Sequence, residues 1–154
     1  MNFQTLNMTK IMLLIWPLIP ILWACEKSPE NLKFELTKDS LCDGVAKVDQ
    51  ELFENSESST LFIDEIQITE NCLWVRYSAS GCNGESWELE LIGSEAVQYS
   101  LPPQRNIRFI LKNNELCEAH ITKEKTFDIS ALRSEGEAML LNVINSEHQL
   151  MYHQ

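Results

Sequence analysis

This sequence has few of the residues that usually carry chemistry. Its three histidines, His120, His148 and His153, all lie from position 120 onward. No serine stands in a G-x-S-x-G nucleophile motif, and no pair of cysteines has the C-x₂-C spacing of a zinc site. The sequence therefore gives no positive sign of catalysis, and we expect neither an enzyme nor a metal or other cofactor.

Basic residues are also scarce. The chain has 12 lysines and arginines against 23 aspartates and glutamates, a net charge of −11. Nucleic acid and anionic lipid surfaces attract proteins of the opposite charge. A partner of either kind is therefore not expected.

Long apolar runs are limited to one, residues 11–24, which follows Lys10. It is shorter than the roughly 20 residues that a spanning helix needs, and it has the build of a secretory signal peptide. The segment Leu22-Trp23-Ala24-Cys25 resembles a bacterial lipobox, in which the cysteine is lipidated and becomes the new N-terminus. We predict a signal peptide at 1–24 and a lipid anchor and tether at 25–35. The acyl chains on Cys25 would then hold the protein at the outer membrane or elsewhere in the cell envelope, periplasm-facing or surface-exposed.

Four cysteines remain once Cys25 carries lipid: Cys42, Cys72, Cys82 and Cys117. An even number in an exported chain predicts two disulfides. Three pairings are possible. The facing of the expected strands favours Cys82 with Cys117 and Cys42 with Cys72, because Cys117 would point toward the core with Ala119 and Ile121.

Alternating apolar and polar residues predict that residues 36–154 form a single β domain. We expect an antiparallel immunoglobulin-like β-sandwich of seven or eight strands, with a small β-barrel as the alternative. Gly93-Ser94 is expected to be a turn. Residues 51–60 are expected to be a loop with at most a short helical turn at its start, and residues 130–133 a single helical turn. The expected strands cover 66–69, 73–77, 87–91, 97–101, 107–111, 117–121, 127–129, 138–144 and 149–152.

Two segments are candidate binding surfaces. Trp74 and Arg76 share the strand face opposite Leu73 and Val75, and an exposed tryptophan beside an arginine is a common anchor in interfaces. Residues 102–108 (PPQRNIR) concentrate two arginines in an expected loop that could receive an acidic partner.

Two pairs of residues are weaker candidates for chemistry. Ser80 could meet His120 only through folding, so geometry must decide whether they form a nucleophile and base. Glu118 and His120 share one strand face, where two side chains could hold a metal, but a solvated outer face explains them as well.

Several short motifs together resemble a group of uncharacterised lipoproteins of Bacteroidetes-type bacteria. Those proteins have a lipobox, an SGGC-like loop, a CEA-like strand and an FDLSPL-like segment. The matching residues here are Asn71-Cys72-Leu73, Tyr77-Ser78-Ala79-Ser80-Gly81-Cys82, Glu88-Leu89, Cys117-Glu118-Ala119 and Phe127-Asp128-Ile129-Ser130-Ala131-Leu132. The resemblance covers about 62–154 and implies fold and location only.

These observations favour a non-enzymatic binding or structural module that is anchored by lipid in the cell envelope. Its ligand is unknown, and a protein or a glycan is the expected partner. Two alternatives of other classes remain: a small envelope hydrolase on the same scaffold, and an envelope assembly or stress factor whose strand edges capture client chains.

Overall fold

The computed structural model describes residues 42–153. The signal peptide, the lipidation site at Cys25 and the tether, all of them predictions, lie outside this part of the chain. Within residues 42–153, no helix has the length and apolar character needed to cross a membrane.

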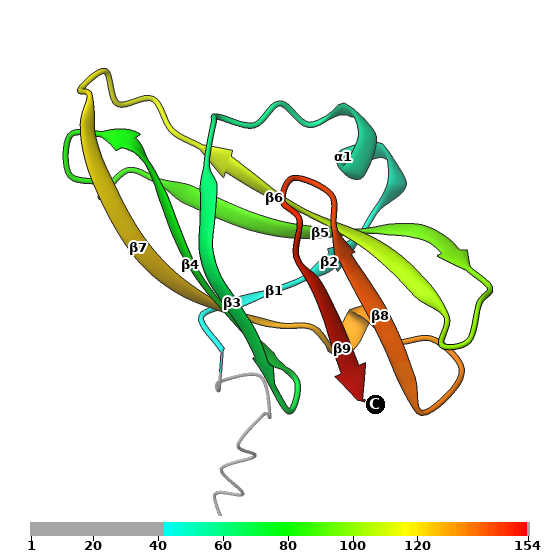
Figure 1. Cartoon of the computed structure of the whole chain (residues 1–154). Helices are drawn as coiled ribbons and strands as arrows, with labels where there is room; N and C mark the ends of the chain where they lie inside the picture. Colours follow the sequence, from blue (N-terminus) through cyan, green and yellow to red (C-terminus); the bar gives the residue numbers. More distant parts are fainter. Residues whose placement is uncertain (1–41, 154) are drawn as a thin grey trace, which may run out of the picture. The chain divides into compact units, whose positions relative to one another are not determined.

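The regular secondary structure of the described chain is almost entirely β-strand, arranged in two sheets (Figure 1). One sheet has the order β1-β7-β4-β3 and the other β2-β5-β6-β8-β9. Helix α1 (Gln50–Asn55) and the 3-10 turn η2 (Ser130–Leu132) connect strands, and both confirm expected helical turns. The strands are β1 (Gly44–Val45), β2 (Lys47–Val48), β3 (Phe62–Thr69), β4 (Cys72–Gly81), β5 (Glu88–Gln98), β6 (Gln104–Lys112), β7 (Ala119–Asp128), β8 (Ala138–Val143) and β9 (Gln149–His153).

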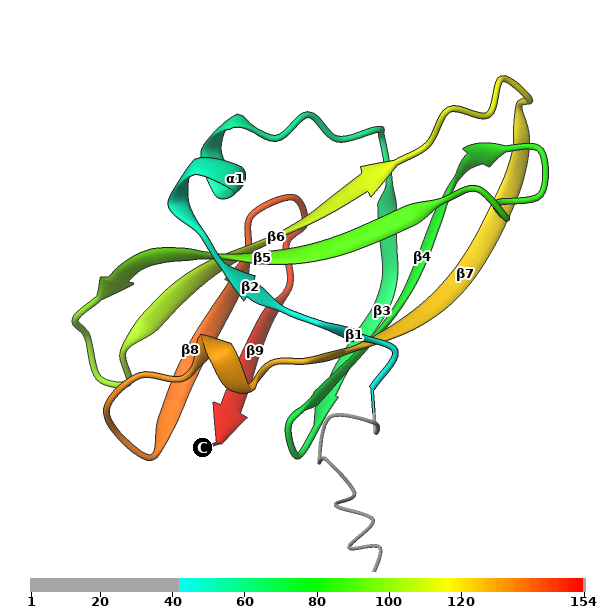
Figure 2. The ribbon, with the colours of Figure 1, turned by 180° about the vertical axis from the view of Figure 1, so that it is seen from behind.

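The sheets are mixed, which corrects the expectation of purely antiparallel pairing. In the described chain β1 pairs with β7, β2 with β5 and β6 with β8 in parallel. The first two parallel pairs arise because the N-terminal segment passes from one sheet to the other around the buried Ala46 (Figure 2). The strands are divided between two sheets and are not joined in one closed sheet, so the arrangement is sandwich-like and not the alternative small barrel.

The core lies between the inner faces of the two sheets. Leu73, Val75 and Tyr77 alternate along β4 as predicted and are buried. Phe127 of β7 faces Phe109 of β6 across the core, with ring centroids 6.0 Å apart. Side chains from strands distant in sequence therefore fix the two sheets against each other.

Strand β5 differs most from the expectation. It runs without a break through Gly93-Ser94, which is therefore not a turn, and it merges two expected strands. The register against β6 shifts between Gly93 and Val97, because extra residues form a bulge there. Strand β6 starts at Gln104, so only the beginning of the expected 102–108 loop is a loop.

Candidate functional site

Two disulfides join segments that are far apart in sequence. Cys42 bonds to Cys72, and Cys82 bonds to Cys117, with Cα atoms 6.0 and 4.8 Å apart. These are the pairs expected from strand facing. Cys117 does not point toward the core as expected, however, because it precedes β7 and is exposed, as is Cys82. That bridge ties two surface loops together instead of lining the core.

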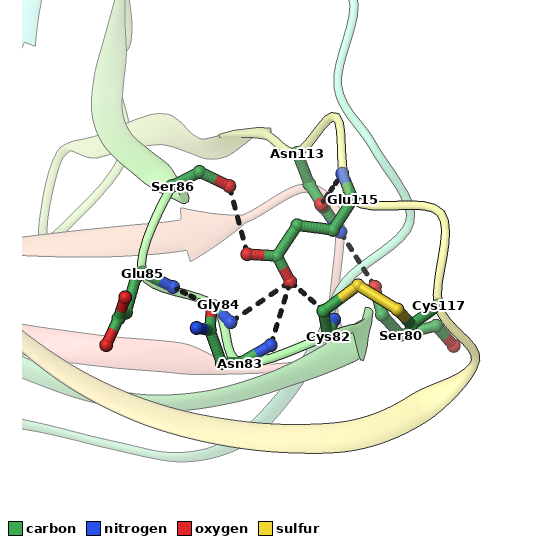
Figure 3. Close-up of a disulfide and its surroundings, with 9 residues drawn as sticks. All are labelled: Ser80, Cys82, Asn83, Gly84, Glu85, Ser86, Asn113, Glu115 and Cys117. Carbon is green, nitrogen blue, oxygen red and sulfur yellow. Dashed lines mark hydrogen bonds between the residues drawn. A yellow bond between two sulfur atoms is a disulfide. The ribbon is translucent and has the colours of Figure 1, made fainter.

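Next to this bridge, the carboxylate of Glu115 accepts several hydrogen bonds from a tight loop (Figure 3). Oε2 of Glu115 accepts hydrogen bonds from the backbone N–H groups of Cys82, Asn83 and Gly84, at 2.5, 3.1 and 3.0 Å. Oε1 accepts from the hydroxyl of Ser86 at 2.9 Å. We call residues 82–86 together with Glu115 the Glu115 loop.

These hydrogen bonds decide the charge state of the carboxylate. Desolvation raises the pKa of Glu115, but hydrogen bonds from Gly84, Cys82, Ser86 and Asn83 outweigh it and lower the pKa to about 2. Such converging N–H groups usually form an anion site. Here the chain's own carboxylate already occupies it, so the Glu115 loop has a structural role: the carboxylate holds the loop in place.

The conformation of the Glu115 loop depends on the backbone of Gly84. Its φ of 69° lies in the left-handed region, which favours glycine. A Cβ at this position would also lie 3.0 Å from Cδ of Lys123. The ammonium of Lys123 donates to the carbonyl of Gly84, which fastens the loop to β7.

The opposite end of the β5–β6 pair has the reverse arrangement: a buried cation with few partners. Arg105 is 7% exposed and lies on the inner face of β6, two residues before the buried Ile107. Its Nη1 donates to the carbonyl of Ser94, which lies in the bulge of β5. Burial lowers the pKa of the Arg105 guanidinium, yet arginine keeps its proton at neutral pH.

The bulge and Arg105 need a glycine beside them. A Cβ on Gly93 would lie 2.5 Å from Cδ2 of the buried Leu132 and 3.4 Å from Cδ of Arg105. Gly93 thus allows η2 and Arg105 to approach the backbone of β5 closely.

Arg105 lines a hollow of about 490 Å³. A second cation, Arg133, also lines it, together with one acid, Glu135. Arg133 is held in place, since its Nε donates to the hydroxyl of Tyr152 at 2.9 Å and its Nη2 to Oδ1 of Asn71 at 2.6 Å. The apolar side of the hollow is formed by Val97, Tyr99 and Pro103.

A second hollow, of about 480 Å³, adjoins the first through Pro103. It is mostly apolar and is lined by Leu101, Pro102 and Met151 among others. Tyr99 and Leu101 are 95% and 99% exposed. We call residues 97–105 the hairpin end; it lies on the right in Figure 1, whereas the loops that form the Glu115 loop lie on the left.

The predicted Trp74–Arg76 surface lies on the outer face of β4. Arg76 forms an ion pair with Glu65 of β3 at 2.9 Å, and its guanidinium carbon is 6.0 Å from the centroid of the Trp74 ring. Both residues are half-buried. The arginine thus partly covers the tryptophan and is itself paired.

The histidines are placed apart from one another. His120 lies opposite Ser80 in the β4–β7 ladder, and both are exposed. His148 Nδ1 lies 3.0 Å from the hydroxyl of Ser146, and His153 is exposed in β9. Across residues 42–153, no group of three His, Cys, Asp or Glu side chains is arranged to hold a metal ion.

Sequence reasoning placed arginines in the 102–108 segment but missed the burial of Arg105. The signal was present, because Arg105, Ile107, Phe109 and Leu111 alternate and so belong to one strand face. The Glu115 loop left no such signal, since its contacts join residues about 30 positions apart.

Comparison with known proteins gives no family. No protein-family model matches the chain, and no curated protein matches it. Among solved structures, a protein of unknown function (DUF1344) from Bacteroides vulgatus has a TM-score of 0.48 at 13% identity, over 71% of this chain and 56% of that one. A protein from Parabacteroides distasonis described as toxin-related has a TM-score of 0.45 at 14% identity, over 72% and 60% of the two chains. The chain thus spans less than two thirds of either protein.

Proposed function

We propose that this protein is a non-enzymatic binding module, anchored by lipid in the bacterial cell envelope, and that it contacts its partner with the hairpin end. The observation that carries the proposal is the exposure of Tyr99 and Leu101 beside two hollows. Aromatic side chains and arginines that line hollows supply most of the energy in many interfaces. In immunoglobulin-like sandwiches, loops at one end of the sheets bind the ligand, and we propose the same use of an end here.

The location part of the proposal has two supports. The two disulfides are compatible with an oxidising, extracytoplasmic compartment. The apolar segment and Cys25 have the order of a lipoprotein signal. Cys25→Ser should abolish lipid labelling and release the protein from membranes, because no acyl chain would then hold it. Membrane fractionation checks this, and a variant that still sediments with membranes would contradict it.

The hairpin end and the Trp74–Arg76 surface differ in what they leave unpaired. At Trp74, the arginine is paired with Glu65 and covers part of the ring. At the hairpin end, Tyr99 and Leu101 project almost fully into solvent. Solvated apolar groups gain more on binding than groups that are already covered, which favours the hairpin end as the contact surface.

The chain offers a matched pair of leucines for the test. Leu101 at the hairpin end and Leu116 beside the Glu115 loop are 99% and 97% exposed. Each is replaced in turn by the photoreactive residue p-benzoylphenylalanine in the full chain, in cells that make the protein, and the cells are irradiated. We expect a discrete covalent adduct, with protein or with glycan, from position 101 and none from position 116.

Both positions are equally accessible, so differences in exposure do not explain such a result. Equal adducts from the two positions, or none from position 101, would overturn the assignment of the contact surface to the hairpin end. An adduct from position 101 that persists after Tyr99→Ser but is lost after Trp74→Ser would move the surface to β4.

A further inference from the structure

Arg105 is a buried cation whose hydrogen bonding is incomplete. It is more than nine-tenths buried, and the Ser94 carbonyl accepts from its Nη1. Its Nε is buried and has no acceptor within the described chain. A guanidinium has five N–H donors, and a buried donor without an acceptor costs free energy. The fold therefore maintains an unfavourable group at this position.

Other cations of the described chain are treated differently. Its ion pairs use Lys47, Arg76 and Lys112, whose side chains are about half exposed, with Glu65, Glu88 or Glu90 as partners. The carboxylates in these ion pairs thus contact cations that water already solvates. A buried charge gains far more from a partner than an exposed one does. Arg105 has no ion-pair partner among the described residues, and the hollow that it lines is open to an anionic ligand.

From these observations we propose that the hollow at the hairpin end binds a carboxylate group of a ligand, with Arg105 as the main contact and Arg133 as the second. A carboxylate in the hollow would accept hydrogen bonds from the Arg105 guanidinium, which lines it, and so give this buried cation the counter-charge that the described chain does not provide. Arg133 is fixed by Tyr152 and Asn71, so it adds positive charge at little entropic cost.

The charges around the hollow favour a carboxylate over a phosphate. A phosphate group carries close to two negative charges at neutral pH, a carboxylate one. The protein has a net charge of −11, and Glu135 borders the hollow. Repulsion from both grows with the charge of the ligand, so a single negative charge fits two arginines and one glutamate better.

The apolar surroundings indicate the rest of the ligand. Val97, Tyr99 and Pro103 line the arginine hollow, and Pro103 connects it to the apolar hollow at Leu101 and Met151. A carboxylate attached to an apolar or ring-shaped body would bury both parts at once. This inference rests on the proposed function, since it names the chemistry that the hairpin end would recognise.

The direct test observes the Arg105 Nε–H group by ¹H–¹⁵N NMR on the full chain in lipid nanodiscs. The probe is phenylacetate, with phenylacetamide as its uncharged match and inorganic phosphate as the second anion. We expect a saturable shift of the Nε–H resonance with phenylacetate, little shift with phenylacetamide and weaker binding of phosphate. An unmoved resonance, or equal shifts with phenylacetate and phenylacetamide, would overturn the proposal. Tighter binding of phosphate would overturn the carboxylate assignment.

Variants sharpen the test. Arg105→Met should weaken phenylacetate binding at least about tenfold, because a charged hydrogen bond is lost, and Arg105→Lys should weaken it less. The matched control is Arg76→Met, which removes one arginine from β4 and should leave binding unchanged. The wild-type titration stands alone if Arg105→Met fails to fold. A photoadduct from position 101 without any phenylacetate binding would refute the carboxylate site and leave the proposed function intact.

Discussion

The two ends of the β5–β6 pair treat their charged groups in opposite ways. At one end, the Glu115 carboxylate lies near the surface and accepts hydrogen bonds from Cys82, Asn83, Gly84 and Ser86. At the other end, Arg105 is buried, and its Nε has no acceptor within the described chain. The half-buried carboxylate is thus well partnered, whereas the buried guanidinium is not.

Stability alone would favour the reverse arrangement, because burial raises the cost of an unpartnered charge. In the Glu115 loop, the hydrogen bonds to the carboxylate and the disulfide together hold the backbone in one conformation. Arg105 places a positive charge at a hollow, where the proposed ligand would supply the counter-charge. If the proposed carboxylate site is correct, one end of the molecule serves rigidity and the other serves recognition.

The largest expected effect comes from the rigid end. Replacing both Cys82 and Cys117 with serine should lower the free energy of unfolding by about 2–4 kcal/mol, because the bridge closes a loop of 35 residues. Denaturant unfolding followed by circular dichroism measures the change. Amide hydrogen exchange should accelerate in residues 82–86 and stay unchanged in residues 97–105. Equal acceleration at both ends would show that they are not independent.

A smaller loss of stability is expected from Glu115→Gln, which keeps the shape of the side chain and removes its charge. The pKa of Glu115 is about 2 in the folded protein, below its ordinary value of 4.5. A lowered pKa stabilises the fold above pH 4.5, and this contribution disappears as the pH falls from 4.5 toward 2. The variant should therefore melt below the wild type at pH 7.

The pH dependence separates the role of this charge from a general loss of packing. The difference in melting temperature between wild type and Glu115→Gln should shrink as the pH falls from 4.5 toward 2. The matched control is Glu118→Gln, which changes an exposed acid nearby and should melt like the wild type. A difference that is the same at pH 7 and pH 3 would contradict the assigned role of the carboxylate.

The sequence was sufficient to predict which strand faces are buried, but not how the strands pair. Alternation in β4 placed Leu73, Val75 and Tyr77 in the core, and they are buried. Alternation carries no information on pairing direction, so the sequence did not predict the parallel pairing of β8. Strands β1 and β2 have two residues each, which is too short to show alternation, and they were not predicted as strands. The β5 bulge was also missed, because glycine followed by serine is equally typical of a turn.

The candidate site shows the same division. The strand face of Arg105 follows from its spacing to Ile107 and Phe109. Its hydrogen bond to Ser94 depends on the bulge, and its second cation, Arg133, arrives from the segment after η2. Contacts of this kind are set by the packing of distant segments, so local sequence patterns do not reveal them.

The smallest effect on stability is expected at the recognition end, from Arg105→Met. The substitution removes a buried charge but keeps most of the apolar volume, and replacements of this kind are often neutral or stabilising. The lost hydrogen bond to Ser94 works against the gain, so we expect the free energy of unfolding to change by less than about 1 kcal/mol. Denaturant unfolding provides the measurement.

The control is Arg108→Met on the same strand. Nη1 of Arg108 donates to the Phe53 carbonyl at 3.0 Å and the side chain is partly exposed, so its loss should be modestly destabilising. If Arg105→Met instead lost several kcal/mol, Arg105 would be structural in the same sense as Glu115, and the contrast between the two ends would disappear. An unchanged stability together with lost phenylacetate binding would mean that Arg105 is retained for its ligand.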